Sequence, residues 1–238
     1  MAVAALGALL AAPAQAHQPR VQPLVAELYT AQGCVSCNKA YAPFTELASR
    51  RGVIALTLPV DYWDYLGWRD AFADPAFTAR QKAYEHHFGL REVYTPQLVL
   101  EGRGQASADD SKMVEALWVR VRREARPGPA LTLMRDGRLH VAAAAAPGGR
   151  ARVWMLRFEP NPAPVRVTGG DNKGAVVSYR NVVRELVDLG EWRGEGRTFR
   201  LPKATSPGLM TVILVQRDHG GPILAARLLP SPGTRTAP

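Results

Sequence analysis

The sequence is short of cysteine, and this shortage limits the chemistry that the chain can perform. Its 238 residues include only two cysteines, Cys34 and Cys37. A structural zinc site needs four ligands, and no second cysteine pair exists to complete one. No Ser/His/Asp triad and no pair of catalytic carboxylates can be assigned from the residue order. The two cysteines are therefore the strongest candidates for chemistry.

Acidic residues and lysine are scarce relative to arginine. The chain has 30 Lys and Arg against 21 Asp and Glu, a net charge of +9, and five of its basic residues are lysine. The arginines are scattered, and no RNP, zinc-finger or helix-turn-helix pattern accompanies them. We therefore expect no nucleic-acid partner. The positive charge favours weak attraction to acidic partners or anionic lipid.

The chain also has no long apolar run after its N-terminus, so we expect no integral membrane segment once a leader is removed. Residues 1–16 are uncharged and apolar and end in Ala14-Gln15-Ala16, which is typical of a signal peptidase site. We expect these residues to be a signal peptide and the mature protein to be periplasmic or secreted. The alternative is an unstructured, alanine-rich leader. In an oxidising compartment, a lone cysteine pair can rest as a disulfide.

The cysteines form the motif Cys34-Val35-Ser36-Cys37, which lies where an apolar run gives way to a helical pattern. A thiolate at a helix N-terminus has a lowered pKa. We expect a redox-active pair, with Cys34 as the exposed attacking sulfur and Cys37 as the resolving one. A structural disulfide is one alternative, although it would close a very short loop. Copper binding is another alternative. The candidate histidine ligands are His86, His87, His140 and His219, but none lies at a spacing from the cysteines that indicates a metal site.

The clearest break in the sequence is Arg126-Pro127-Gly128-Pro129. Residues 21–126 alternate strand and helix patterns in the order βαβαββα, and residues 130–229 are short strands between strong turns. We expect an α/β domain followed by a mainly β, sandwich-like domain, and a disordered tail over residues 230–238. The glycine-rich segment 169–174 lacks Walker spacing and is interpreted as a turn.

An aromatic loop, residues 61–68, follows the second predicted strand. Tyr62, Trp63 and Trp68 form a candidate substrate platform, and the alternative is that they are buried, since large aromatics dominate protein cores. Asp61 is a candidate for proton transfer during thiol exchange. Its alternative role, shared with Asp64, is to accept hydrogen bonds from nearby N–H groups as a loop cap.

The order βαβαββα, with Cys-x-x-Cys after the first strand and Pro96 before the later hairpin, resembles the thioredoxin fold. That resemblance implies that Thr95-Pro96 is a cis peptide beside the cysteines and that the backbone of Thr95 pairs with substrate. More closely, residues 27–37, 60–68, 93–97 and 179–184 resemble the DUF1223 family of uncharacterised exported proteins. Members usually follow the second cysteine with two prolines, where this chain has Asn38-Lys39.

These patterns predict an exported thiol-disulfide oxidoreductase or redox-linked chaperone. The catalytic residues would be Cys34, Cys37, Thr95 and Pro96. Its partners would be protein thiols or disulfides and a redox protein that resets the pair, and it would need no organic cofactor and no metal. The alternative is a non-catalytic periplasmic protein that binds a ligand or copper and in which the disulfide only fixes the loop.

Overall fold

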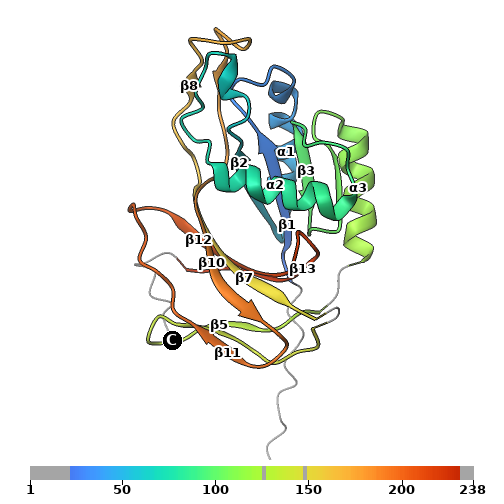
Figure 1. The fold of residues 1–238 in the computed structure, drawn as a ribbon, viewed down its shortest axis with the longest axis vertical. Helices are drawn as coiled ribbons and strands as arrows, with labels where there is room; N and C mark the ends of the chain where they lie inside the picture. Colours follow the sequence, from blue (N-terminus) through green and yellow to red (C-terminus); the bar gives the residue numbers. More distant parts are fainter. Residues whose placement is uncertain (1–21, 125–126, 147–148, 231–238) are drawn as a thin grey trace, which may run out of the picture.

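The structure is a computed structural model that describes residues 22–124, 127–146 and 149–230 (Figure 1). The predicted signal peptide lies outside these residues, as does the predicted tail except for Pro230. Within the described ranges, no helix is long and apolar enough to cross a membrane.

The first half of the chain confirms the predicted order of strands and helices. Two short 3-10 helices, η1 (Ser36–Lys39) and η2 (Asp64–Leu66), precede the longer helices, so the helix expected to begin at Ser36 is interrupted at Ala40. The main elements are β1 (Leu24–Thr30), α1 (Tyr41–Ala48), β2 (Val53–Pro59), α2 (Pro75–Phe88), β3 (Gln97–Leu100), β4 (Gly104–Ser107) and α3 (Ser111–Arg123).

Helix α2 begins and ends where the sequence predicts. The side chain of Asp74 accepts a hydrogen bond from the backbone N–H of Ala76, and Pro75 occupies the first helical position, where no N–H is needed. Gly89 ends the helix with a φ of 64°, a left-handed conformation that glycine adopts without steric cost. These terminal residues therefore define the two ends of α2.

The second half of the chain is built from strands. The predicted hairpin around Asp136-Gly137 joins the first two strands, and the glycine-rich segment 169–174 is a turn between two short ones. The strands are β5 (Leu131–Leu133), β6 (Leu139–Val141), β7 (Ala151–Glu159), β8 (Val165–Arg166), β9 (Val176–Val177), β10 (Val182–Trp192), β11 (Arg197–Phe199), β12 (Met210–Arg217) and β13 (Ile223–Leu228).

One eight-stranded sheet runs through both halves, in the order β13-β12-β7-β10-β2-β1-β3-β4. The halves meet where β10 pairs in parallel with β2, at Val182 and Thr57. The Thr57 N–H donates to the carbonyl of Asn181 at 2.9 Å, and the Asn181 side chain donates to the carbonyl of Ala55 at 2.8 Å. The predicted β region therefore extends the sheet of the α/β region, a continuity that the sequence did not predict.

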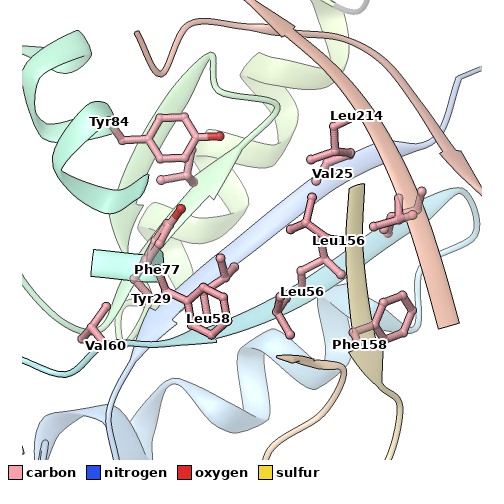
Figure 2. Close-up of a cluster of buried hydrophobic side chains, with 14 of the residues drawn as sticks. Val25, Tyr29, Leu56, Leu58, Val60, Phe77, Tyr84, Leu156, Phe158 and Leu214 are labelled. Atoms are coloured by element: carbon pink, nitrogen blue, oxygen red, sulfur yellow. The ribbon is translucent and has the colours of Figure 1, made fainter. Parts of the chain in front are cut away.

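Three groups of elements pack against this sheet. Helices α1 and α3 cover one face of its first half, and α2 covers the other face (Figure 1). Beneath α2, Phe77 and Tyr84 pack with Tyr29 and with strand residues of both halves (Figure 2). The small sheet β11-β6-β5 packs against the later strands and forms a sandwich-like layer there. Fully burying one large apolar side chain stabilises a fold by about 1.5–3 kcal/mol.

Candidate functional site

Cys34 lies in the turn that connects β1 with η1, and Cys37 lies in η1 itself. Cys34 and Cys37 form a disulfide whose Cα atoms are 5.3 Å apart. The N–H of Cys37 donates to the carbonyl of Cys34, and the N–H of Cys34 donates to the carbonyl of Ala31, both at 3.2 Å. The pair therefore sits at the junction between strand and helical segment that the sequence predicts.

The prediction of an exposed attacking sulfur is wrong for this structure. Cys34 and Cys37 are both 0% exposed, whereas Val35 between them is 56% exposed. The two sulfurs belong to the apolar cluster beneath α2. The local motif alone would leave the first cysteine at an open turn. Both cysteines are buried because the cluster around them includes residues that are distant in sequence.

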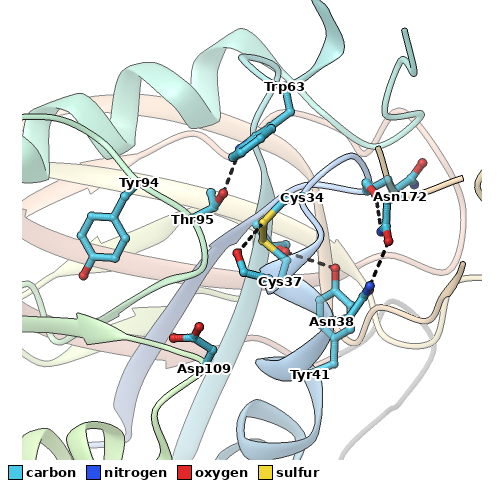
Figure 3. The surroundings of a disulfide bond; sticks show 12 residues. Cys34, Cys37, Asn38, Tyr41, Trp63, Tyr94, Thr95, Asp109 and Asn172 are labelled. Atoms are coloured by element: carbon cyan, nitrogen blue, oxygen red, sulfur yellow. Dashed lines mark hydrogen bonds between the residues drawn. A yellow bond between two sulfur atoms is a disulfide. The ribbon is translucent and has the colours of Figure 1, made fainter. Parts of the chain in front are cut away.

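Trp63 of the aromatic loop packs against the cluster that contains the disulfide. Its indole Nε1 donates a hydrogen bond of 2.8 Å to the hydroxyl of Thr95, beside the cysteines (Figure 3). The approach is close at Gly33, where an added Cβ would lie 3.5 Å from the Cβ of Trp63. Trp63 and Thr95 thus connect the two segments that flank the cysteine turn.

The peptide bond between Thr95 and Pro96 is cis, as the resemblance to thioredoxins implies. Thr95 lies next to the disulfide in Figure 3. The structure therefore brings together Cys34, Cys37 and Thr95 from the predicted site. The substrate-pairing role of Thr95-Pro96 stays a prediction.

The aromatic residues of the predicted platform differ in exposure and direction. Tyr62 packs on the same core as Trp63, and burial raises its pKa to about 12. Trp68 donates from Nε1 to the side-chain oxygen of Gln32 at 2.9 Å. The most exposed aromatic of this loop is Tyr65, at 81%. Their role in substrate binding stays a prediction.

Asp61 and Asp64 bond to neighbouring segments. The Thr78 hydroxyl, in α2, donates to Oδ1 of Asp61 at 2.6 Å, and the Asp70 N–H donates to Oδ1 of Asp64 at 3.0 Å. For Asp64 this is the predicted cap of an N–H group, whereas Asp61 accepts from a hydroxyl. The proposed proton transfer by Asp61 stays a prediction.

A buried polar network beside the disulfide escaped the sequence analysis. We call it the disulfide network, and it consists of Gln32, Asp70, Asn172 and Tyr179. The side chain of Asn172 donates to the carbonyl of Gln32 at 2.8 Å, and the Gln32 N–H donates to Asp70 at 2.8 Å. Tyr179 also donates to Asp70, at 3.1 Å. The sequence analysis singled out the glycine-rich turn that carries Asn172 and the segment 179–184 that begins with Tyr179, but it gave neither of them a role at this site.

The environment of Asp70 is mostly neutral. Burial raises the pKa of its carboxyl above the ordinary value, although hydrogen bonds from Phe72, Gln32 and Tyr179 oppose that shift. The same network reaches η1, because the Asn38 side chain donates to Asn172 at 3.0 Å. Residues far apart in the chain thus hold both ends of the cysteine turn.

The histidines considered as copper ligands do not form a metal-binding cluster with the two cysteines. Throughout the residues that the structure describes, no group of three or more His, Cys, Asp or Glu side chains could hold a metal ion. His86 and His87 lie in the last turn of α2, and His140 lies 3.3 Å from the hydroxyl of Thr198.

Two solved structures resemble this chain. An X-ray crystal structure of protein AGR_C_4864 from Agrobacterium tumefaciens matches with a TM-score of 0.71 and 28% identity, over 90% of this chain and 96% of that one. HBP35 of Porphyromonas gingivalis matches with a TM-score of 0.56 over 91% of this chain and 78% of that one, and its 11% identity speaks for the fold alone. No curated protein matches.

The model of the DUF1223 family, described as a protein of unknown function, matches residues 25–216. This span contains the cysteine pair, the aromatic loop, Thr95-Pro96 and the glycine-rich turn with Asn172. The chain belongs to the DUF1223 family.

Proposed function

We propose that this protein is an exported thiol-disulfide oxidoreductase or redox-linked chaperone that uses the Cys34–Cys37 pair. One observation carries the proposal: the disulfide lies at the strand-to-helix junction, beside Thr95 of the cis peptide and beneath Trp63 (Figure 3). A disulfide that only braced a surface turn would need none of these surroundings.

The order of the elements over residues 24–123 supports the proposal, because it is the order on which the resemblance to thioredoxins rests. The strands and helices follow the order βαβαββα, and the cysteines come directly after β1. Strand β1 is central among the first four strands, pairing in parallel with β2 and antiparallel with β3. Helices cover both faces of this part of the sheet, and the cysteine turn follows the end of β1, where a partner would have to approach.

In the proposed exchange, a thiolate of a partner protein attacks the Sγ atom of Cys34. A new S–S bond forms between partner and Cys34, the Cys34–Cys37 bond breaks, and Cys37 leaves as a thiolate that takes a proton from water. A second thiolate of the same partner then attacks the partner's sulfur atom in the mixed disulfide. This step forms a disulfide within the partner and releases Cys34 as a thiolate. The pair gains two electrons and the partner becomes a disulfide, and a separate redox protein restores the pair.

Such an attack requires access to a sulfur that is buried in this structure. The contact between Trp63 and Thr95 must therefore open before a protein thiol can reach Cys34. A single hydrogen bond contributes about 0.5–1.5 kcal/mol net, so the bond between Trp63 and Thr95 by itself would oppose this opening only weakly. The closed form would then keep the disulfide away from unintended thiols.

The burial of both sulfurs also favours the alternative, a non-catalytic binding protein with a structural disulfide. The two proposals differ in what Cys37→Ser does. In the reverse direction of the exchange, Cys34 attacks a partner disulfide and Cys37 resolves the mixed disulfide. The variant keeps Cys34 and removes the resolving thiol, so in an oxidoreductase mixed disulfides with partners accumulate.

The experiment expresses Cys37→Ser in the periplasm, quenches thiols with acid, and separates adducts on non-reducing gels. Cys34→Ser is the matched control, because it retains one thiol of the same motif at the resolving position. We expect adducts with Cys37→Ser that disappear on reduction, and far fewer with Cys34→Ser. Equal adducts from both variants, or none from either, would support the binding-protein alternative.

A further inference from the structure

A second candidate site lies between α2 and the strands of the second half of the chain. It is a pocket of about 450 Å³ between α2 and the strands β7, β10 and β12. Its apolar walls are alanines of α2 together with Trp154 and Leu186 of the sheet. Small-molecule pockets typically have volumes of about 300–1,000 Å³ and mainly apolar walls with a few polar groups. No residue of the cysteine turn or of the aromatic loop lines it.

The alanines create this pocket. Ala76, Ala79 and Ala83 lie on one face of α2, and their short side chains leave space above the sheet. Trp154 provides a flat ring on the opposite wall, within 5.6 Å of the Arg80 guanidinium carbon. An apolar wall next to an aromatic ring favours a flat ligand that stacks on that ring.

Arg80 supplies the polar group of the pocket. The residue is 8% exposed and lines the pocket, whereas its partner Glu27 does not line it. Nε and Nη2 of Arg80 donate to the two carboxylate oxygens of Glu27, at 2.7 and 3.2 Å, and Nη2 also donates to Tyr84. The hydrogen bonds between described residues leave Nη1 without an acceptor, so its two N–H groups are available to one.

The other charges around the pocket are mostly paired. Arg152 forms an ion pair with Asp188, and Asp218 lies 3.5 Å from Arg150. Arg80 is the least exposed cation that lines the pocket, and Nε of Arg152 and Oδ1 of Asp218 are further buried polar atoms there without a hydrogen-bond partner among the described residues. A carboxylate or sulfonate oxygen is the acceptor that a guanidinium N–H binds most strongly.

We infer that this pocket binds a small organic anion with a flat apolar body. The ring system lies between Trp154 and the alanines of α2, and the anionic group accepts from Nη1 of Arg80. The pocket is separate from the disulfide, so this inference does not depend on redox activity.

The test uses two fluorescent probes that share a ring system. 1-Anilinonaphthalene-8-sulfonate carries the anionic group, and N-phenyl-1-naphthylamine lacks it. Titration of the full-length protein with each dye measures affinity and stoichiometry. We expect one saturable site and about tenfold tighter binding of the sulfonate, since a charge-assisted hydrogen bond contributes on that order. Equal affinity for the two dyes would overturn the requirement for an anion.

Substitutions on α2 locate the site. Ala79 is exposed, so Ala79→Leu fills the pocket without disturbing the core, and leucine has a helix propensity close to that of alanine. His86→Leu is the control, because it adds a leucine to an exposed position of the same helix outside the pocket.

We expect Ala79→Leu to weaken binding of the sulfonate dye about tenfold or more by steric exclusion, while His86→Leu leaves it unchanged. This comparison also removes the general attraction of a chain with a net charge of +9 for anions. Equal binding by the two variants would place the dye elsewhere and overturn the inference. A Cys34→Ser/Cys37→Ser variant should bind the dye normally whether or not the disulfide is redox-active.

Discussion

Two buried polar networks join the first half of this chain to the second, and they differ in how charge is compensated. The disulfide network holds Asp70 among neutral donors, with Asn172 and Tyr179 contributed by the second half. The network beneath α2, which we call the α2 network, consists of Glu27, Arg80, Tyr84 and Gln216. It contains a fully buried ion pair, and Gln216 of β12 donates to Tyr84 at 2.9 Å.

This difference in charge compensation matters for the proposed function, in which α2 stays in place and the loops around the cysteines move. Glu27 holds Arg80 in its charged form: burial opposes that charge, but the carboxylate outweighs burial and raises the pKa of the guanidinium. Breaking this pair would leave a buried charge alone, which is costly. Among the described residues, the disulfide network contains no ion pair, and the proposed function requires the loops around the cysteines to open while α2 stays in place. The following predictions test this contrast, from the largest expected effect to the smallest.

Removal of the cation from the α2 network should have the largest effect. Arg80→Met leaves Glu27 buried without a partner, and we expect the free energy of unfolding to fall by about 3–5 kcal/mol. Urea denaturation measures it. Glu27→Gln/Arg80→Met, which removes both charges, should recover part of that loss.

Arg50→Met is the matched control for Arg80→Met. Arg50 and Glu115 also form an ion pair of 2.7 Å, but their side chains are 29% and 52% exposed. Solvent screens such a pair, so its loss should cost less than about 1 kcal/mol. Similar losses in the two arginine variants would contradict the special role given to the α2 network.

Glu101 should make stability depend on pH. Burial raises the pKa of its carboxyl from 4.5 to about 7, although the N–H of Val25 donates to it at 2.5 Å. Between these two pH values the unfolded chain has lost this proton while the native state still binds it. The contribution of Glu101 to stability is therefore complete below pH 4.5 and is lost as the pH rises through 7.

Glu101→Gln cannot ionise, so we expect it to be more stable than the wild type at pH 8, by on the order of 2 kcal/mol. At pH 4 this advantage should vanish. Thermal unfolding of both proteins at several pH values measures the difference. A constant difference across that range would show that the carboxyl does not titrate as described.

Asn172 tests the disulfide network. Asn172→Ala removes the donor to Gln32 and the acceptor for Asn38, and we expect a loss of about 1–2 kcal/mol in stability. Reduction of the disulfide by dithiothreitol should also become faster, because the cysteine turn is less constrained. The exposed Asn161 provides the control, since Asn161→Ala should change neither quantity. Unchanged reduction in Asn172→Ala would mean that this network does not govern access.

The contact between Trp63 and Thr95 should affect rate more than stability. Thr95→Val keeps the shape of the side chain and removes the acceptor for the indole N–H, so we expect reduction by dithiothreitol to accelerate up to about tenfold. Thr95→Ser retains the hydroxyl and should reduce at the wild-type rate. Tyr65→Ala changes an exposed aromatic of the same loop and should also have no effect. Equal rates in Thr95→Val and Thr95→Ser would contradict the proposed opening.

The local features of the fold could be predicted from the sequence. The order βαβαββα, the caps Asp74 and Gly89, and the hairpin turns all follow from residues within a few positions of each other. The cis bond before Pro96 came from the resemblance to thioredoxins and is present.

The long-range features could not be predicted. Strand β10 pairs with β2 across more than a hundred residues, and no local pattern specifies that pairing. The burial of Cys34 likewise is a tertiary feature, because the apolar cluster that contains it includes residues of both halves of the chain. The motif Cys-x-x-Cys located the disulfide of the structure but carried no information about its burial.

The reduction potential of the Cys34–Cys37 pair tests the central claim most directly. It is measured by equilibrating the purified protein with dithiothreitol or glutathione buffers and alkylating the free thiols. Structural disulfides in secreted proteins typically lie below about −300 mV, and redox-active pairs lie above it. We predict a potential above about −300 mV for the wild type. A value well below that limit would show that the disulfide is structural and would contradict the proposed function.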